Sequence, residues 1–161
     1  MFNPASRPLR VVAGAALAGG LVLGVTACAP STTDLYYAAS DGTRVTLDEG
    51  TVEVINLMIL TSGEGGTAHV HGAIKNHTTD DNVASLVSED GALNLQVELS
   101  SQQTVNLSND DVAGTEIADF PAKPGSTLDV QLSDAAGNAK VVHVPVLDGT
   151  LPEYQDHAPT E

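Results

Sequence analysis

Short apolar segments that alternate with polar residues, and that are separated by turn-forming residues, limit the fold of this sequence more than any other feature. The clearest segment spans residues 93–99, where Leu93, Leu95, Val97 and Leu99 alternate with polar side chains. A period of two places apolar side chains on one face of a β-strand, whereas a helix needs a period near 3.6. No helical period follows residue 35. The sequence therefore predicts an all-β domain.

Comparable segments recur along the chain between polar, Gly-rich or Pro-rich turns. Segment 51–60 begins with alternation and ends as a continuous apolar run. This change predicts a central strand whose second half is covered on both faces. We expect an immunoglobulin-like or cupredoxin-like Greek-key sandwich of about seven or eight short strands over residues 41–147. Further strands are expected at 68–76, 83–87, 105–107, 127–132 and 140–146.

Residues 1–28 differ in composition from the rest of the chain. Arg7 and Arg10 form a short basic region, and a stretch without charges follows from Val11 to Thr26. This apolar stretch is shorter than the ~20 residues of a transmembrane helix. It ends in small residues directly before Cys28. The pattern is typical of a secretory signal peptide, which we expect over residues 1–27.

The residues Val25-Thr26-Ala27-Cys28 resemble the lipobox of bacterial lipoproteins, in which the cysteine receives a diacylglycerol and becomes the N-terminus. The chain has 1 Cys, so an intramolecular disulfide and a Cys-based zinc cluster are excluded. We expect Cys28 to be lipidated, with palmitate among its acyl chains, and residues 28–40 to form a flexible tether. The protein would then be anchored to the outer face of the cytoplasmic membrane. The alternative is an incidental thiol in an ordinary cleaved signal peptide.

Acidic residues strongly outnumber basic ones. The chain has 21 Asp and Glu against 6 Lys and Arg, a formal net charge of -15. Because this charge repels phosphate backbones, a nucleic-acid partner is excluded. Apolar residues make up 42% of the chain and charged residues 17%, which is a composition that can fold around a core. We expect residues 148–161 to form a loosely ordered acidic tail.

Motifs of common enzyme classes are missing from the sequence. It has no G-x-S-x-G, S-x-x-K, P-loop or G-x-G-x-x-G motif, which argues against serine hydrolases and nucleotide-binding enzymes. Paired acids at 80–81 and 110–111 lie in polar turns. Acid–base catalysis needs apolar surroundings that separate two carboxyl pKa values, and such turns do not provide them. We therefore expect no enzymatic activity.

His69 and His71 are the residues for which a metal site can be argued. Residues two apart on a strand share a face, here the outward one, and neutral imidazoles bind copper and zinc. A defined site needs three or four ligands. His77, in the following turn, and His143, on the outward face of its own strand, are candidates for the third. The alternative is that these histidines are solvated surface residues. Met58 is expected to fill space in the core.

Several segments, in this order, resemble a known family. They are A-x-V-x-G-A-I-x-N at 68–76, T-V-x-L at 104–107, K-P-G-x-T-L-x-V-x-L at 123–132 and V-x-V-P-V at 142–146. Over about residues 45–146 the chain resembles the LpqE-like lipoproteins of actinobacteria. These are similar in turn to the PCuAC-type periplasmic copper chaperones. The resemblance implies a cupredoxin-like sandwich, export, lipid anchoring and copper binding.

The copper chaperones bind Cu(I) through His and Met residues that include a late His-x-Met element. Here His143 is followed by Val144 and Pro145, so those ligands do not carry over. A site made of His alone favours Cu(II) or Zn(II), because thioethers select Cu(I). Two functions remain open. One is a non-catalytic interaction module that docks onto another envelope protein or cell-wall polymer, and the other is a copper-chaperone-like lipoprotein that uses His69 and His71.

Overall fold

The structure is a computed structural model that describes residues 40–109 and 111–159. The expected signal peptide (1–27) and almost all of the expected tether (28–40) lie outside the described residues, and so does Cys28. Within the described residues, no helix is long and apolar enough to cross a membrane. Nine strands and one short 3-10 turn, Asp48–Gly50, make up the regular structure of this part of the chain. The predicted all-β class is confirmed.

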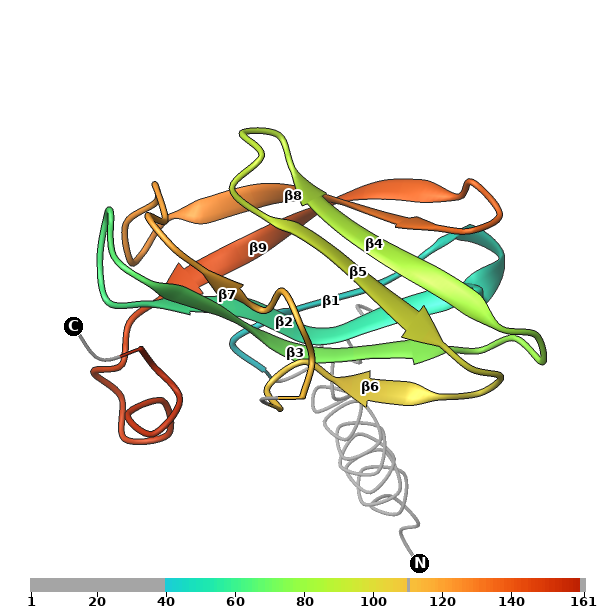
Figure 1. The fold of residues 1–161 in the computed structure, drawn as a ribbon, viewed down its shortest axis with the longest axis horizontal. Helices are drawn as coiled ribbons and strands as arrows, with labels where there is room; N and C mark the ends of the chain where they lie inside the picture. The colour runs from blue at the N-terminus through green and yellow to red at the C-terminus, as the bar shows by residue number, and fades with distance from the viewer. Residues whose placement is uncertain (1–39, 110, 160–161) are drawn as a thin grey trace, which may run out of the picture. The chain divides into compact units, whose positions relative to one another are not determined.

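The strands form a sandwich of two layers (Figure 1). In one layer the strand order is β5-β4-β8-β9, and in the other β2 and β3 are central, with β1, β6 and β7 beside them. A short parallel bridge between β2 and β9 joins the two layers at one edge. The strands are β1 (Thr43–Thr46), β2 (Val52–Thr61), β3 (Ala68–Asn76), β4 (Asn82–Ser88), β5 (Asn94–Leu99), β6 (Thr104–Asn106), β7 (Glu116–Ile117), β8 (Thr127–Asp134) and β9 (Ala139–Leu147).

The core lies between the two layers and is built almost entirely from Val, Leu and Ile side chains. In β5, Leu95, Val97 and Leu99 are buried while the residues between them are exposed, so the predicted alternation is confirmed. Phe120, in the loop between β7 and β8, is fully buried. The chain crosses between the layers after β3, β5 and β7, so many neighbours within a sheet are far apart in the sequence.

A β-bulge in β2 lies opposite Gly72 of β3. The register passes from Ile55 paired with Ala73 to Met58 paired with His71. Two residues of β2 therefore face one residue of β3, which defines a bulge. Gly72 has a φ of 125°, a conformation that glycine adopts without steric cost.

The bulge reverses the alternation of β2. Val54 faces the core before the bulge, and Leu57 and Ile59 face it afterwards. Met58 and Leu60 therefore lie on the outer face of the sheet, and yet they are only 3% and 1% exposed. The prediction that the second half of this strand is covered on both faces is confirmed.

Residues 148–159 follow β9 as a series of turns, and we call them the C-terminal segment. In Figure 1 they form the red loop beside the end of the sandwich where β3 begins. The Tyr154 side chain donates a hydrogen bond to the carboxylate of Asp41, just before β1. Tyr154 and His157 also line a cavity together with Met58 and Leu60. The loose order expected for residues 148–161 stays a prediction.

The close approach of β2 and β3 can be tested by replacing Gly72 with alanine. A Cβ at this position would lie 2.7 Å from the carbonyl oxygen of Asn56. We expect Gly72→Ala to lower the free energy of unfolding by about 1–3 kcal/mol, measured by urea unfolding. Gly91→Ala is the matched control, because Gly91 also has a positive φ but its Cβ would meet nothing within 4 Å. Equal losses in the two variants would contradict a role for the close approach.

Candidate functional site

Strand β3 places His69 and His71 on the same outer face. Val70 and Ile74 face the core, so the alternation of the strand turns both histidines away from it, as predicted. Their ring centroids are 6.3 Å apart and the rings are nearly parallel, at 19°. The His69 side chain is 36% exposed, whereas His71 is only 8% exposed. Another part of the chain must therefore cover His71.

The C-terminal segment covers it. The Nε2 atom of His71 lies 3.2 Å from the carbonyl oxygen of His157, and the two ring centroids are 5.7 Å apart with the rings edge to face. Because a carbonyl oxygen can only accept a hydrogen bond, Nε2 of His71 carries the proton and Nδ1 keeps the lone pair of the neutral ring.

Burial is the main cause that lowers the pKa of His71. The hydrogen bond to the His157 carbonyl opposes this shift, and the charges of His157 and His69 add to it. The net lowering favours the neutral imidazole. That is the form in which histidine binds metal ions.

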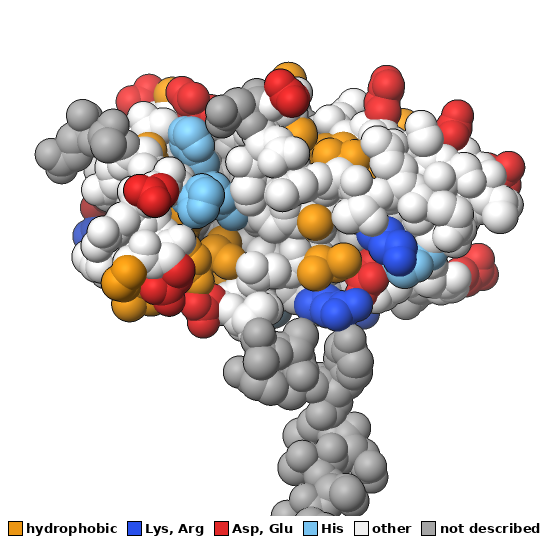
Figure 2. Space-filling model, turned by 90° about the horizontal axis from the view of Figure 1, so that it is seen from below, with side chains coloured by type: hydrophobic (Ala, Val, Ile, Leu, Met, Phe, Trp, Pro, Cys, Tyr) orange, Lys and Arg blue, Asp and Glu red, His pale blue; other side chains and the backbone are white. Residues whose placement is uncertain are grey.

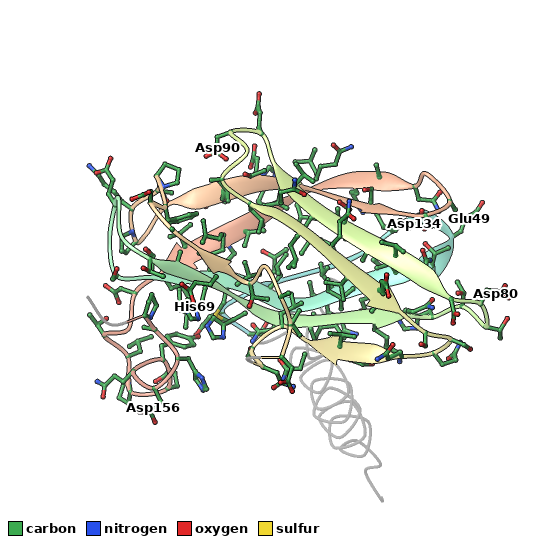
Figure 3. All side chains as sticks on the ribbon, viewed as in Figure 1. Glu49, His69, Asp80, Asp90, Asp134 and Asp156 are labelled. Carbon is green, nitrogen blue, oxygen red and sulfur yellow. The ribbon has the colours of Figure 1, made fainter. Side chains whose placement is uncertain are left out.

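The three imidazoles line one open pocket of about 400 Å³, together with the carboxylates of Glu116 and Asp156. Figure 2 shows histidine side chains gathered at one side of the face seen from below, with acidic side chains around them. Figure 3 shows His69 at the start of β3, next to the C-terminal segment that carries Asp156.

Glu116 reaches the pocket from β7, where it is the cross-strand neighbour of His69. Its Oε2 atom lies 3.7 Å from Nε2 of His69, and its side chain is 71% exposed. A contact this exposed adds little to stability. Glu116 and Asp156 do give the pocket a negative local charge, which attracts cations.

Met58 of β2 lies beside the same histidines. It is paired with His71 in the sheet register, and both residues line a neighbouring cavity with His157. The sequence favoured a core position for Met58. The structure buries this side chain, but on the outer face of β2 rather than between the layers. A thioether next to imidazoles is a soft donor.

The donor set suits a borderline metal ion such as Cu(II) or Zn(II), for which imidazoles are preferred ligands. Two imidazoles that share a tetrahedral ion have ring centres roughly 5 Å apart, given bonds of about 2.0–2.1 Å. The observed separations, 6.3 and 5.7 Å, are slightly larger. Among the described residues, no group of three or more His, Cys, Asp or Glu is arranged so that it could hold a metal ion.

His77 is far from this pocket. It follows the other end of β3, roughly 20 Å along the strand from His71. Its Nε2 atom lies 2.8 Å from one carboxylate oxygen of Glu53, and Nε of Arg44 donates to the other at 2.6 Å. His77 therefore belongs to a charge cluster at the far end of β2 and β3.

His143 lies on the outer face of the other layer. Its Nδ1 atom is 2.6 Å from the carboxylate of Asp129 on β8. The structure thus brings His69 and His71 to His157, and not to His77 or His143. No local sequence signal connects His157 with His71, because 86 positions separate the two residues.

No known protein-family profile matches the chain, and no curated protein matches it. Among solved structures, the chain is similar to the copper-bound PCuAC domain from PmoF2, at 12% identity and a TM-score of 0.48, over 66% of this chain and 98% of that one. It is also similar to the apo PCuAC domain from PmoF1, at 16% identity and a TM-score of 0.45, over 65% of this chain and 98% of that one. Similarities of this size assign neither a family nor a function.

Glu53 provides a test of the cluster that engages His77. Burial raises the pKa of Glu53, but the hydrogen bonds and charges of Arg44 and His77 outweigh it and leave this pKa below its ordinary value of 4.5. Ionised Glu53 therefore stabilises the fold above pH 4.5, and this contribution is lost as the pH falls through the lowered folded-state pKa. We expect Glu53→Gln to lower the free energy of unfolding by about 1–3 kcal/mol at neutral pH, measured by urea unfolding.

The same variant should lose less stability than the wild type when the pH is lowered below 4.5. Glu98→Gln is the control, because Glu98 is exposed on β5 and its replacement should change stability by less than about 0.5 kcal/mol. If Glu53→Gln and Glu98→Gln behaved alike at every pH, the cluster would have no stabilising role.

Proposed function

We propose that this protein is an exported, lipid-anchored, non-catalytic module that binds a metal ion through His69, His71 and His157. One observation carries the metal-binding part: three imidazoles from two distant segments line one pocket. Two of them share the outer face of β3, and the third belongs to the C-terminal segment. Acidic side chains around the pocket favour a cation as the ligand.

The chemistry of the donors supports Cu(II) or Zn(II) as the ion. Imidazole nitrogen is a borderline donor that both ions accept, whereas Cu(I) is selected by sulfur ligands. Met58 is the described sulfur donor beside these histidines, and it is 3% exposed. Neutral rings are the form that binds a metal ion, and burial lowers the pKa of His71, which favours its neutral form.

The anchoring part of the proposal rests on the leader sequence. A basic region, a short apolar stretch and Val25-Thr26-Ala27-Cys28 together indicate export followed by lipidation. Several acyl chains on Cys28 would exceed the two-signal requirement for stable membrane attachment. The β-sandwich would then be presented on the outer face of the cytoplasmic membrane. Docking onto an envelope protein or cell-wall polymer is the function that remains for such a module if it binds no metal.

Metal binding is tested with the full-length protein in detergent, titrated with Cu(II) and Zn(II) by calorimetry. We expect one ion per chain in the wild type and loss of this binding in the His69→Ala/His71→Ala double variant, because one imidazole alone cannot form the site. His143→Ala is the matched control, since His143 is exposed and lies on the other layer. Metal binding that is weak in the wild type, or unchanged in the double variant, would refute the proposed metal site.

Lipidation is tested with Cys28→Ser in a bacterial host that processes lipoproteins. We expect labelled palmitate and the mass of a diacylated N-terminus in the wild type and neither in the variant, because the thiol is the site of attachment. Ser31→Ala, which keeps the thiol, should incorporate the label normally. Intact-mass analysis of membrane fractions gives the result. An unlabelled wild type cleaved at another position would show an ordinary signal peptide.

A further inference from the structure

The C-terminal segment is closed on itself. Its ends meet where Gly149 packs against Ala158, since a Cβ on Gly149 would lie 2.6 Å from the Cβ of Ala158. Between them, the carbonyl of Tyr154 accepts hydrogen bonds from the main-chain N–H groups of His157 and Ala158, at 3.0 and 2.8 Å. These turns fix where the ring and the carbonyl of His157 are presented.

Two side-chain contacts attach this closed segment to the sandwich. The first is the hydrogen bond from the Tyr154 hydroxyl to Asp41. Burial of the phenol, together with the hydrogen bond to Asp41 and its charge, raises the pKa of Tyr154 to about 12, so the hydroxyl remains a donor at neutral pH. The second contact joins the carbonyl of His157 to His71. The His157–His71 contact lies at the pocket that the three imidazoles line, and the Tyr154–Asp41 contact lies outside that pocket.

We propose that the C-terminal segment is a strap that completes the metal site. The bound metal ion in turn holds the strap closed. The inference rests on the proposed metal-binding function. The strap supplies the His157 ring as the third ligand. Its main-chain carbonyl accepts a hydrogen bond from His71 Nε2, which leaves Nδ1 of His71 to bind the ion. A carbonyl that fixes the tautomer of a ligating histidine is a recurrent feature of metal sites.

The places at which the three rings are attached explain why the ion would act on the strap. His69 and His71 are both fixed to β3, whereas His157 is exposed and belongs to a segment without strand pairing. Drawing the His71 and His157 rings together from 5.7 Å therefore requires movement mainly of the strap. Metal binding and strap closure are thermodynamically linked. If closure of the strap increases the affinity for the metal by some factor, the bound metal increases the equilibrium constant for closure by the same factor.

Tyr154 is a positioning residue in this arrangement. It does not line the pocket of the three imidazoles, but its bond to Asp41 holds the strap beside them. Removing the hydroxyl should weaken metal binding without removing a ligand. Outer partners of metal ligands typically account for about 10–100-fold in affinity, which sets the effect expected for Tyr154→Phe.

The first experiment titrates the full-length protein in detergent with Zn(II) and Cu(II) by calorimetry. We expect His157→Ala to lose more than about 100-fold in affinity and Tyr154→Phe to lose about 10-fold. Gln155→Ala is the matched control, because Gln155 is an exposed residue of the same segment and should bind as the wild type does. Urea unfolding without metal establishes that each variant is folded.

The second experiment measures strap closure directly, with a protease that cleaves after glutamate. Glu153 lies exposed in the strap, and Glu89 lies exposed in the turn between β4 and β5 and serves as the internal reference. We expect saturating Zn(II) to slow cleavage after Glu153 relative to Glu89 in the wild type. It should have no such effect in His157→Ala or in His69→Ala.

The outcomes separate the two proposals. If the wild type binds metal and the His69→Ala/His71→Ala variant does not, but His157→Ala binds normally and Zn(II) leaves cleavage after Glu153 unchanged, the strap is refuted. The metal-binding function then stands on His69 and His71, without His157 as a ligand. If the wild type binds neither ion, the metal-binding function fails and the strap fails with it. Tyr154→Phe binding like Gln155→Ala would refute the positioning role of Tyr154.

Discussion

The packing of β2 against β3 at Gly72 determines what the outer face of this sheet carries. The β2 backbone approaches so closely that only glycine fits, and the bulge it makes there reverses the alternation of the strand. Leu57 and Ile59 therefore fill the core while Met58 and Leu60 turn outward. On a regular strand without the bulge, Met58 and Leu60 would instead continue the core-facing side of Val54. In this structure the two side chains form an apolar surface beside His71, and the C-terminal segment lies next to this surface.

The sequence predicts those parts of the fold whose cause is local. The alternation of Leu93 to Leu99 predicts one exposed and one buried face, and every residue of β5 follows this pattern. The apolar run that ends segment 51–60 predicts a strand whose second half is covered on both faces, and the burial of Met58 and Leu60 confirms it. Its bulge could not be predicted, because it depends on which residue of β3 lies opposite. That register is a property of the pair of strands and cannot be predicted from either strand alone.

The same distinction applies to the candidate site. The spacing of His69 and His71 predicts a shared face, because a period of two is local, and the structure places them so. His77 and His143 are candidate third ligands by sequence because one follows β3 in a turn and the other lies on the outward face of its own strand. The contacts that engage them, with Glu53 and Asp129, come from other strands. His157 reaches the pocket through turns of the C-terminal segment that carry no periodic signal.

A single β-strand cannot complete a three-ligand site. Residues two apart on one face are separated by roughly 7 Å, so a third ligand at the next position would lie about 13 Å from the first. Because strand side chains stand roughly perpendicular to the sheet, imidazoles at those two positions lie far more than the roughly 5 Å apart that one tetrahedral ion requires. A pair of histidines on β3 therefore needs a third donor from another element, and His157 is the described imidazole that the chain folds against them. The geometry of the strand therefore requires a donor from another element, and in the proposed site the C-terminal segment supplies it.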